Sequence, residues 1–172
     1  MTRKGGEKGF TLVELLVVIA IVLILASLLV PSFEYMRTDA EGAVCNGRLR
    51  NLWTAFSFYL HDGNGWPQVP GEIQIGSQQE QQWWLDFTKE NMRLSSNEWQ
   101  CPSIKRMMNS STNATKQCLI SYLPTLFDSK PRTALSWPQM PWFTEIANAH
   151  RKGNLTIRTD GSVMASGTSN PQ

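Results

Sequence analysis

His150 and the pair Asp160-Gly161 are the residues whose types and spacing first suggest chemistry. A histidine and a carboxylate can exchange protons or bind a metal, but either role needs a nucleophile or a third ligand at a diagnostic spacing. The sequence offers neither, so no cofactor, metal site or enzymatic activity is predicted. We expect His150 to begin a strand and hydrogen-bond the opposing backbone, and Asp160 to form a hairpin turn. Because both could lie together at one end of a sheet, Ca²⁺ binding through Asp160 is left open.

Glu14 is notable because it is a lone carboxylate in an apolar run. Residues 15–30 carry no charge, and extending the run back to Phe10 gives twenty-one residues with Glu14 as the single acid. At about 1.5 Å per residue such a helix is about 31 Å long, close to the hydrocarbon thickness of a bilayer. The sequence therefore predicts a membrane-anchored protein, in which a lone carboxylate is costly and needs a reason.

Composition and charge exclude two other classes of protein. With 41% hydrophobic and 17% charged residues in a chain of 172, the sequence can form a folded domain with an appendage and is not disordered. The formal charge of +2 arises in residues 1–9, where Arg3, Lys4 and Lys8 outnumber Glu7. The remainder is formally neutral, so no nucleic-acid partner is predicted.

Three kinds of N-terminal signal compete for this apolar run. A cleaved secretory signal has a shorter core and small residues at its cleavage site, which residues 28–31 do not provide. A plain signal anchor fits the length, with the basic residues held in the cytoplasm, but leaves Glu14 unexplained. The third possibility explains Glu14, because residues 9–14, Gly-Phe-Thr-Leu-Val-Glu, closely resemble the N-terminal motif of type IV prepilins and type II secretion pseudopilins.

The resemblance implies a processing step and an assembly role. A prepilin peptidase would cut between Gly9 and Phe10, the new N-terminal Phe10 would be N-methylated, and Glu14 would become the fifth mature residue. Cleavage would create an α-amine at Phe10 that the Glu14 carboxylate of a neighbouring subunit can neutralise in a poorly solvated filament core. Pro31 would be the twenty-second mature residue, where many pilins have a helix-disturbing proline.

Later segments extend the resemblance to a large bacterial prepilin-like group. They are the region from Cys45 to Pro67, the Cys101-Pro102-Ser103 segment, and the tail in which nine residues separate His150 from Asp160-Gly161, as in the H-x9-DG proteins. One disulfide and one unpaired thiol are expected from three cysteines on the oxidising side of a membrane. The resemblance favours the pairing Cys45–Cys101, and Cys101–Cys118 is the competitor.

The elements that must position these residues follow from periodicity. Residues 10–60 predict one long helix, apolar at first and amphipathic later, bent or locally melted at Pro31. A shorter helix is expected over 81–92, loops over 95–100 and 105–116, and strands over 73–75, 119–123, 155–157 and 163–164. The last two strands form the clearest hairpin, for which Asp160-Gly161 predicts a type I′ turn.

The predicted fold class is α+β: a type IV pilin-like long kinked helix packed on the small antiparallel sheet that the family implies. The predicted divisions are a cleaved leader over 1–9, a transmembrane and assembly helix over 10–30, its amphipathic continuation over 31–61, and a globular head over 62–172. Seven tryptophans predict core filling, with an exposed aromatic platform for sugars or an exported partner as the alternative. Residues 137–142, which two prolines hold extended, are its best candidate surface.

These features together predict a non-enzymatic, prepilin-like subunit of a type IV pilus or type II secretion pseudopilus. The expected partners are other pilin or pseudopilin subunits, a prepilin peptidase, the membrane and an inner-membrane assembly platform. The expected location is the bacterial inner membrane, with one span, a cytoplasmic N-terminus and a periplasmic head. The alternative is a signal-anchored ectodomain that never polymerises and binds glycan or protein; sequons at Asn109, Asn113 and Asn154 would matter only in a glycosylating host.

Overall fold

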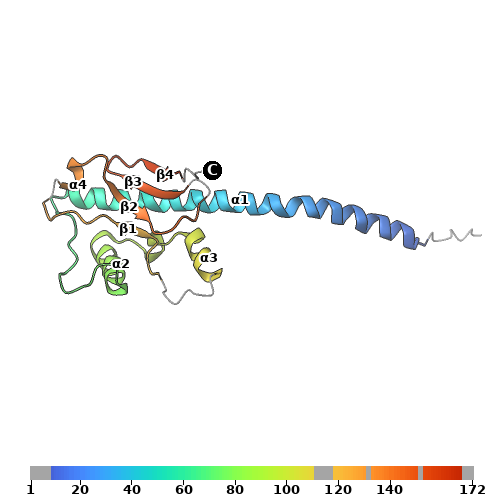
Figure 1. Ribbon diagram of the computed structural model, residues 1–172, viewed down its shortest axis with the longest axis horizontal. Helices are drawn as coiled ribbons and strands as arrows, with labels where there is room; N and C mark the ends of the chain where they lie inside the picture. The colour runs from blue at the N-terminus through green and yellow to red at the C-terminus, as the bar shows by residue number, and fades with distance from the viewer. Residues whose placement is uncertain (1–8, 111–117, 131–132, 151–152, 168–172) are drawn as a thin grey trace, which may run out of the picture. The chain divides into compact units, whose positions relative to one another are not determined.

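The computed structural model describes residues 9–110, 118–130, 133–150 and 153–167. Its contacts divide the chain into two units, residues 1–37 and 38–172, which are described separately. Helix α1, Leu12–His61, runs through both units and confirms the long helix predicted over 10–60 (Figure 1). The backbone stays helical at Pro31, so no local melting occurs there. A bend at Pro31 remains a prediction.

The second unit contains a four-stranded antiparallel meander. Strands β1 (Tyr122–Pro124), β2 (Pro141–Glu145), β3 (Asn154–Arg158) and β4 (Val163–Ser166) are ordered β1-β2-β3-β4. Tyr122 pairs with Glu145, and Phe143 pairs with Ile157. In Figure 1 the sheet lies along the C-terminal half of α1. The predicted α+β class, a long helix with a small antiparallel sheet, is therefore confirmed.

The core forms where the amphipathic half of α1 meets the sheet. The helix contributes five buried apolar side chains at steps of three and four residues: Cys45, Leu49, Leu52, Phe56 and Leu60. The ring of Phe56 lies at the centre of an aromatic cluster, with centroids 4.9–6.3 Å from those of four other rings: Trp66, Trp84, Trp99 and Phe143. Such ring contacts add to the gain from burying apolar area.

Core filling is the role of most of the tryptophans. Trp66, Trp84, Trp99 and Trp142 are at most 1% exposed, while Trp53 and Trp83 are partly buried against the core. Trp137 is 61% exposed. The expectation that residues 137–142 form one exposed surface is wrong for Trp142, because it belongs to β2 and faces the core.

Three local predictions need correction. Residues 73–75 form turns rather than a strand, since Pro70 and Gln74 accept hydrogen bonds from amides three residues later. The stretches expected as loops contain the 3₁₀ helix η1 (Ser96–Trp99) and helix α3 (Pro102–Ser110); the rest of the second stretch, 111–116, lies outside the described residues. Proline favours the first turn of a helix, where its missing N–H costs nothing, so Pro102 starts α3.

Two further predictions, the helix over 81–92 and the last hairpin, are confirmed in outline. Helix α2, Gln78–Met92, confirms the helix expected over 81–92 and begins earlier because Ser77 caps it. The short helix α4, Thr133–Ser136, was not anticipated. The hairpin of β3 and β4 is as predicted, but only Gly161 has positive φ (77°). A type I turn with Gly161 in the left-handed region therefore replaces the predicted type I′ turn.

Candidate functional site

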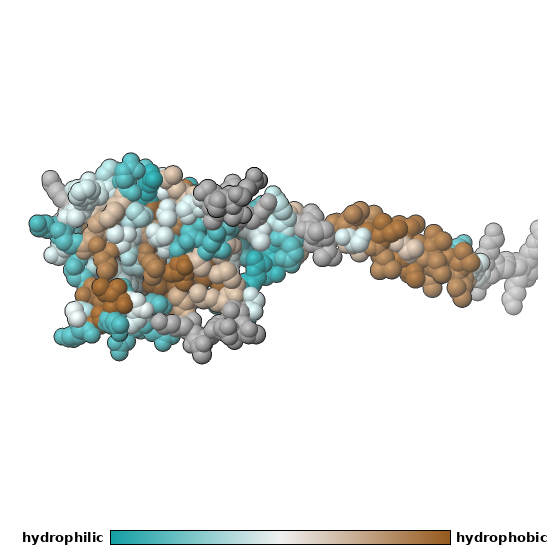
Figure 2. All heavy atoms as spheres, viewed as in Figure 1, coloured by the Kyte–Doolittle hydropathy of each residue, from teal (hydrophilic) through white to brown (hydrophobic). Residues whose placement is uncertain are grey.

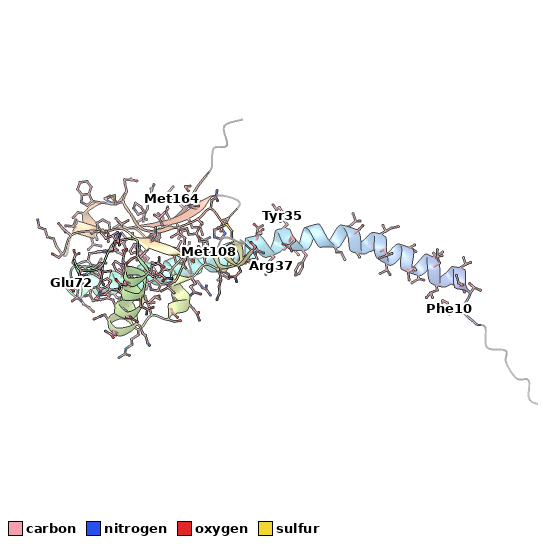
Figure 3. All side chains as sticks on the ribbon, turned by 60° about the horizontal axis from the view of Figure 1, so that its bottom comes forward. Phe10, Tyr35, Arg37, Glu72, Met108 and Met164 are labelled. Atoms are coloured by element: carbon pink, nitrogen blue, oxygen red, sulfur yellow. A yellow bond between two sulfur atoms is a disulfide. The ribbon has the colours of Figure 1, made fainter. Side chains whose placement is uncertain are left out.

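The first turn of α1 is a capping box built by Thr11 and Glu14. The Thr11 N–H and hydroxyl donate to Glu14 Oε2 at 2.9 and 2.8 Å, and the Glu14 N–H donates to Thr11 Oγ1 at 3.3 Å. A Thr followed three residues later by Glu satisfies otherwise unpaired helix-start amides in this way. These contacts fold the Glu14 carboxylate back toward the start of the helix. Phe10 lies at that end of α1 (Figure 3).

The helix after this cap is apolar around its whole circumference. Large apolar side chains from Leu12 to Leu29 are 48–80% exposed, and none of the apolar window is buried. Figure 2 shows this part of α1 as an almost continuous hydrophobic surface. Among the described residues, this helix alone is long and apolar enough to cross a membrane. Such a surface needs lipid or other apolar helices around it.

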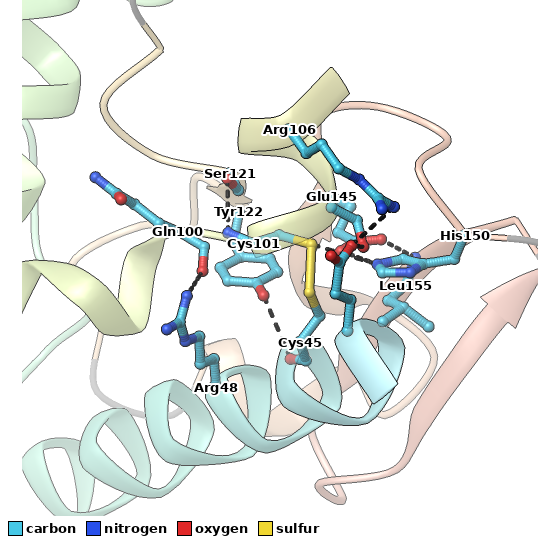
Figure 4. The surroundings of a disulfide bond; sticks show 12 residues. Cys45, Arg48, Gln100, Cys101, Arg106, Ser121, Tyr122, Glu145, His150 and Leu155 are labelled. Atoms are coloured by element: carbon cyan, nitrogen blue, oxygen red, sulfur yellow. Dashed lines mark hydrogen bonds and ion pairs between the residues drawn. A yellow bond between two sulfur atoms is a disulfide. The ribbon is translucent and has the colours of Figure 1, made fainter. Parts of the chain in front are cut away.

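In the second unit, the disulfide joins Cys45 of α1 to Cys101 at the start of α3, with 5.3 Å between their Cα atoms (Figure 4). This is the pairing that the resemblance favours. The Cys118 thiol instead donates to the Ile120 carbonyl at 2.9 Å. The disulfide fixes the amphipathic half of α1 to the segment that leads into α3.

His150 and Glu145 lie beside this disulfide. His150 Nε2 is 3.0 Å from Glu145 Oε1 and 3.4 Å from Cys101 Sγ, and the two side chains are 7% and 0% exposed. Glu145 Oε2 accepts the Leu155 N–H at 2.8 Å. His150 therefore contacts side chains, rather than beginning a strand and bonding the opposing backbone as predicted. The physical reason is that the buried Glu145 carboxylate needs donors.

Asp160 does not join His150. It lies in the turn after β3, whereas His150 precedes β3, so a strand of five residues separates them. Asp160 Oδ1 accepts the Ser162 N–H at 2.8 Å. Hydrogen bonds from the Ser162 side chain and backbone lower the pKa of Asp160 from its ordinary value. Its predicted turn role agrees with these contacts, and Ca²⁺ binding there remains a prediction.

Hydrogen bonds to the backbone fix the surroundings of the disulfide. The Cys101 N–H donates to Ser121 Oγ at 2.8 Å, and the Tyr122 hydroxyl donates to the Cys45 carbonyl at 3.3 Å. Burial, reinforced by the Glu145 charge, raises the pKa of Tyr122 well above its ordinary value, so the hydroxyl remains a donor. Arg106 pairs with Glu41 at 2.9 Å above the same helix.

Sequence reasoning missed two residues of these sites. Glu145 gave a signal in retrospect, since it is an acid at the end of an apolar run that contains Trp142 and Phe143. Thr11 could have been found from its spacing to Glu14, which is that of a capping box. Neither signal reveals that Glu145 lies beside His150, because that depends on how β2 and β3 pair.

The fold and the N-terminal segment define the class of protein. Residues 4–30 match the family model described as the prokaryotic N-terminal methylation motif. This motif, on a long apolar helix that leads into a small antiparallel sheet, supports a type IV prepilin-like protein.

One curated protein supports this assignment. The chain is similar to the type IV wide pilus major component PilA4 of Thermus thermophilus, with 41% identity over 61 residues. The matched region is 36% of this chain and 47% of PilA4, so the chain spans about half the length of this relative. No solved structure matches the chain.

Proposed function

We propose that this chain is a non-enzymatic, prepilin-like subunit of a type IV pilus or type II secretion pseudopilus. A prepilin peptidase removes residues 1–9, Phe10 is N-methylated, and the subunits assemble through their N-terminal helices. The observation that carries this proposal is the motif match at residues 4–30 on a helix whose apolar side chains are exposed on every side.

The apolar helix suits two successive environments. In the inner membrane, its side chains contact lipid, with the basic leader in the cytoplasm and the head on the opposite side. In a filament, neighbouring apolar helices replace the lipid. Leaving the membrane without such neighbours would cost about 25 cal/mol for every Å² of apolar surface exposed to water. Transfer therefore calls for an energised assembly platform.

Glu14 has two tasks in this proposal. Its contacts with Thr11 start the helix and remain possible after cleavage, because Thr11 is then the second residue and keeps its amide N–H. Both of the hydrogen bonds that the structure describes for its carboxylate use Oε2. The carboxylate can thus also receive the α-amine of Phe10 from a neighbouring subunit, which would fix the axial position of the two helices.

The processing step is tested by mass spectrometry of the N-terminus of the mature protein from its native host. We expect a protein that begins at N-methylated Phe10. A mature protein that retains residues 1–9 would refute the processing step and would favour a signal-anchored ectodomain that does not polymerise.

The assembly step is tested with three variants of the full chain. Glu14→Ala and Glu14→Gln should both insert in the membrane but enter filaments poorly, because neither can neutralise an α-amine. Gln keeps an oxygen that can accept the Thr11 hydrogen bonds, so it separates charge from helix capping. Thr11→Ala is the control, and we expect it to assemble. Normal assembly of Glu14→Gln would show that capping, rather than charge, is what Glu14 supplies.

A further inference from the structure

The disulfide in the head lies against two further ligand-type side chains that the proposed assembly does not use. Cys45 Sγ, Cys101 Sγ, a carboxylate oxygen of Glu145 and a ring nitrogen of His150 all lie within 4.8 Å of one another. They come from α1, the start of α3, the end of β2 and the segment before β3 (Figure 4). The four donors therefore converge from separate elements of the head.

We propose that Cys45, Cys101, Glu145 and His150 bind one Zn²⁺ ion when the disulfide is open. Thiolate, imidazole and carboxylate groups all bind zinc, and four such donors match its tetrahedral coordination. The site concerns the head alone and does not depend on filament assembly.

The spacing of the donors fits a tetrahedral ion. With bonds of about 2.0–2.3 Å to zinc, the ligand atoms of a tetrahedral site lie about 3.3–3.8 Å apart. The 3.4 Å between His150 Nε2 and Cys101 Sγ lies in this range, the 3.0 Å between His150 Nε2 and Glu145 Oε1 is slightly below it, and all four ligand atoms lie within 4.8 Å of one another, so small side-chain shifts reach it. Opening the disulfide lets the two sulfur atoms separate to the distance that zinc needs, and the 5.3 Å between the Cα atoms leaves room for this.

The surrounding hydrogen bonds already orient these donors. The Leu155 N–H holds Glu145 Oε2, which leaves Oε1 directed toward His150 and the sulfur atoms. Ser121 Oγ accepts the Cys101 N–H and fixes the backbone of that ligand. Such outer contacts fix the direction of ligands in zinc sites.

Zinc also compensates the charge of its own ligands. Two thiolates and one carboxylate bring a charge of −3 to the site, and Zn²⁺ reduces it to −1. In the disulfide, each sulfur is bonded to the other and has no negative charge to offer. Zinc and the disulfide therefore exclude each other, so oxidation and zinc supply compete for a newly made head.

A phosphine can serve as the reductant that opens the disulfide. The phosphine gives two electrons to the disulfide and is oxidised to its phosphine oxide with an oxygen atom from water, while Cys45 and Cys101 become thiols. Zinc binding then forms two zinc–sulfur bonds and releases two protons. Zinc affinity should consequently rise with pH.

The experiment uses the full chain in detergent micelles, after reduction by a phosphine or with its disulfide intact. Zn²⁺ is titrated in competition with a chromophoric chelator, and Co²⁺ serves as a spectroscopic probe. We expect one Zn²⁺ per reduced chain, and a cobalt spectrum with thiolate charge-transfer and tetrahedral visible bands. The oxidised chain should bind no stoichiometric zinc. Absence of stoichiometric zinc binding by the reduced chain overturns the proposal.

Variants identify the donors. Glu145→Gln and His150→Gln keep the approximate shape of their side chains. Changing a residue that only contacts a zinc ligand typically weakens zinc binding about 10- to 100-fold, and we expect a larger loss from each of these two variants because each removes a ligand. The double variant Cys45→Ser/Cys101→Ser should lose the thiolate bands of cobalt. Cys118→Ser is the matched control and should bind normally.

Two results would contradict this donor set. They are unchanged zinc affinity in both the Glu145→Gln and His150→Gln variants, and loss of the site in Cys118→Ser. Tryptophan fluorescence of each variant checks that the head is folded. If the double cysteine variant does not fold, the two Gln variants still test the donor set.

Discussion

Removing the Cys45–Cys101 disulfide should cost the head a large part of its stability. The bond spans 56 residues of sequence. In the chain-entropy account, closing a loop of this length removes about 14 cal/mol/K of entropy from the unfolded state, or about 4 kcal/mol at 25 °C. Because a domain is typically stable by about 5–15 kcal/mol, the double variant Cys45→Ala/Cys101→Ala should be close to the limit of folding.

Urea unfolding of the full chain in detergent micelles measures this loss. Tryptophan fluorescence is a suitable signal, because Trp66, Trp84, Trp99 and Trp142 are buried. We expect a free energy of unfolding lower by about 4 kcal/mol, and a steeper dependence on urea because the unfolded chain is less compact. Cys118→Ser is the control. A loss below about 1 kcal/mol would refute the reasoning, since it would mean that the unfolded chain already brings these two segments together.

The remaining predictions concern the helix, the hairpin and its turn. Gly47→Ala should stabilise α1 by about 0.5–1 kcal/mol in urea unfolding, because a Cβ there meets no atom within 4 Å; destabilisation would contradict this. Gly153→Ala should destabilise the head by at least about 1–3 kcal/mol, because Gly153 has φ of 101° and a Cβ would lie 1.6 Å from the Ser166 carbonyl oxygen; a neutral effect on the melting temperature would refute this. The pKa of Asp160 is lower in the folded head than in the unfolded chain, where it is about 3.9. Ionised Asp160 therefore stabilises the head above that pH, and this stabilisation is lost as the pH falls through the folded pKa. The stability difference between wild type and Asp160→Asn should therefore disappear in acid, and a difference that is constant from neutral to acidic pH would exclude this role.

The parts of the fold with strong local signals could be predicted from the sequence. The apolar run and the later helical period define α1 without any tertiary information. The hairpin of β3 and β4 combines apolar alternation with an Asp-Gly turn signal. Its turn type was wrong because Asp160 tolerates positive φ but does not require it, and the longer loop with Gly161 alone in that region also fits the strands.

Other parts depend on contacts that the local sequence does not specify. Strand β2 was hidden because it begins with Pro141 and follows a proline-rich stretch, which reads as an exposed segment until its partners β1 and β3 are known. Residues 105–110, which read as part of a loop, belong to α3, whose first turn contains the buried residues Ser103 and Ile104. The contact of His150 with Glu145 likewise arises only from the order and pairing of the strands.

The place of the disulfide on α1 also determines how the subunit would respond to tension. Helix α1 runs from Leu12 to His61, and Cys45 lies within its second half. If the N-terminal helix is held and the chain is pulled from beyond Cys101, the covalent bridge carries the load past the 56-residue interval that it encloses. That interval would bear no force, and its contour length of about 190 Å would be released only after the bridge is cut.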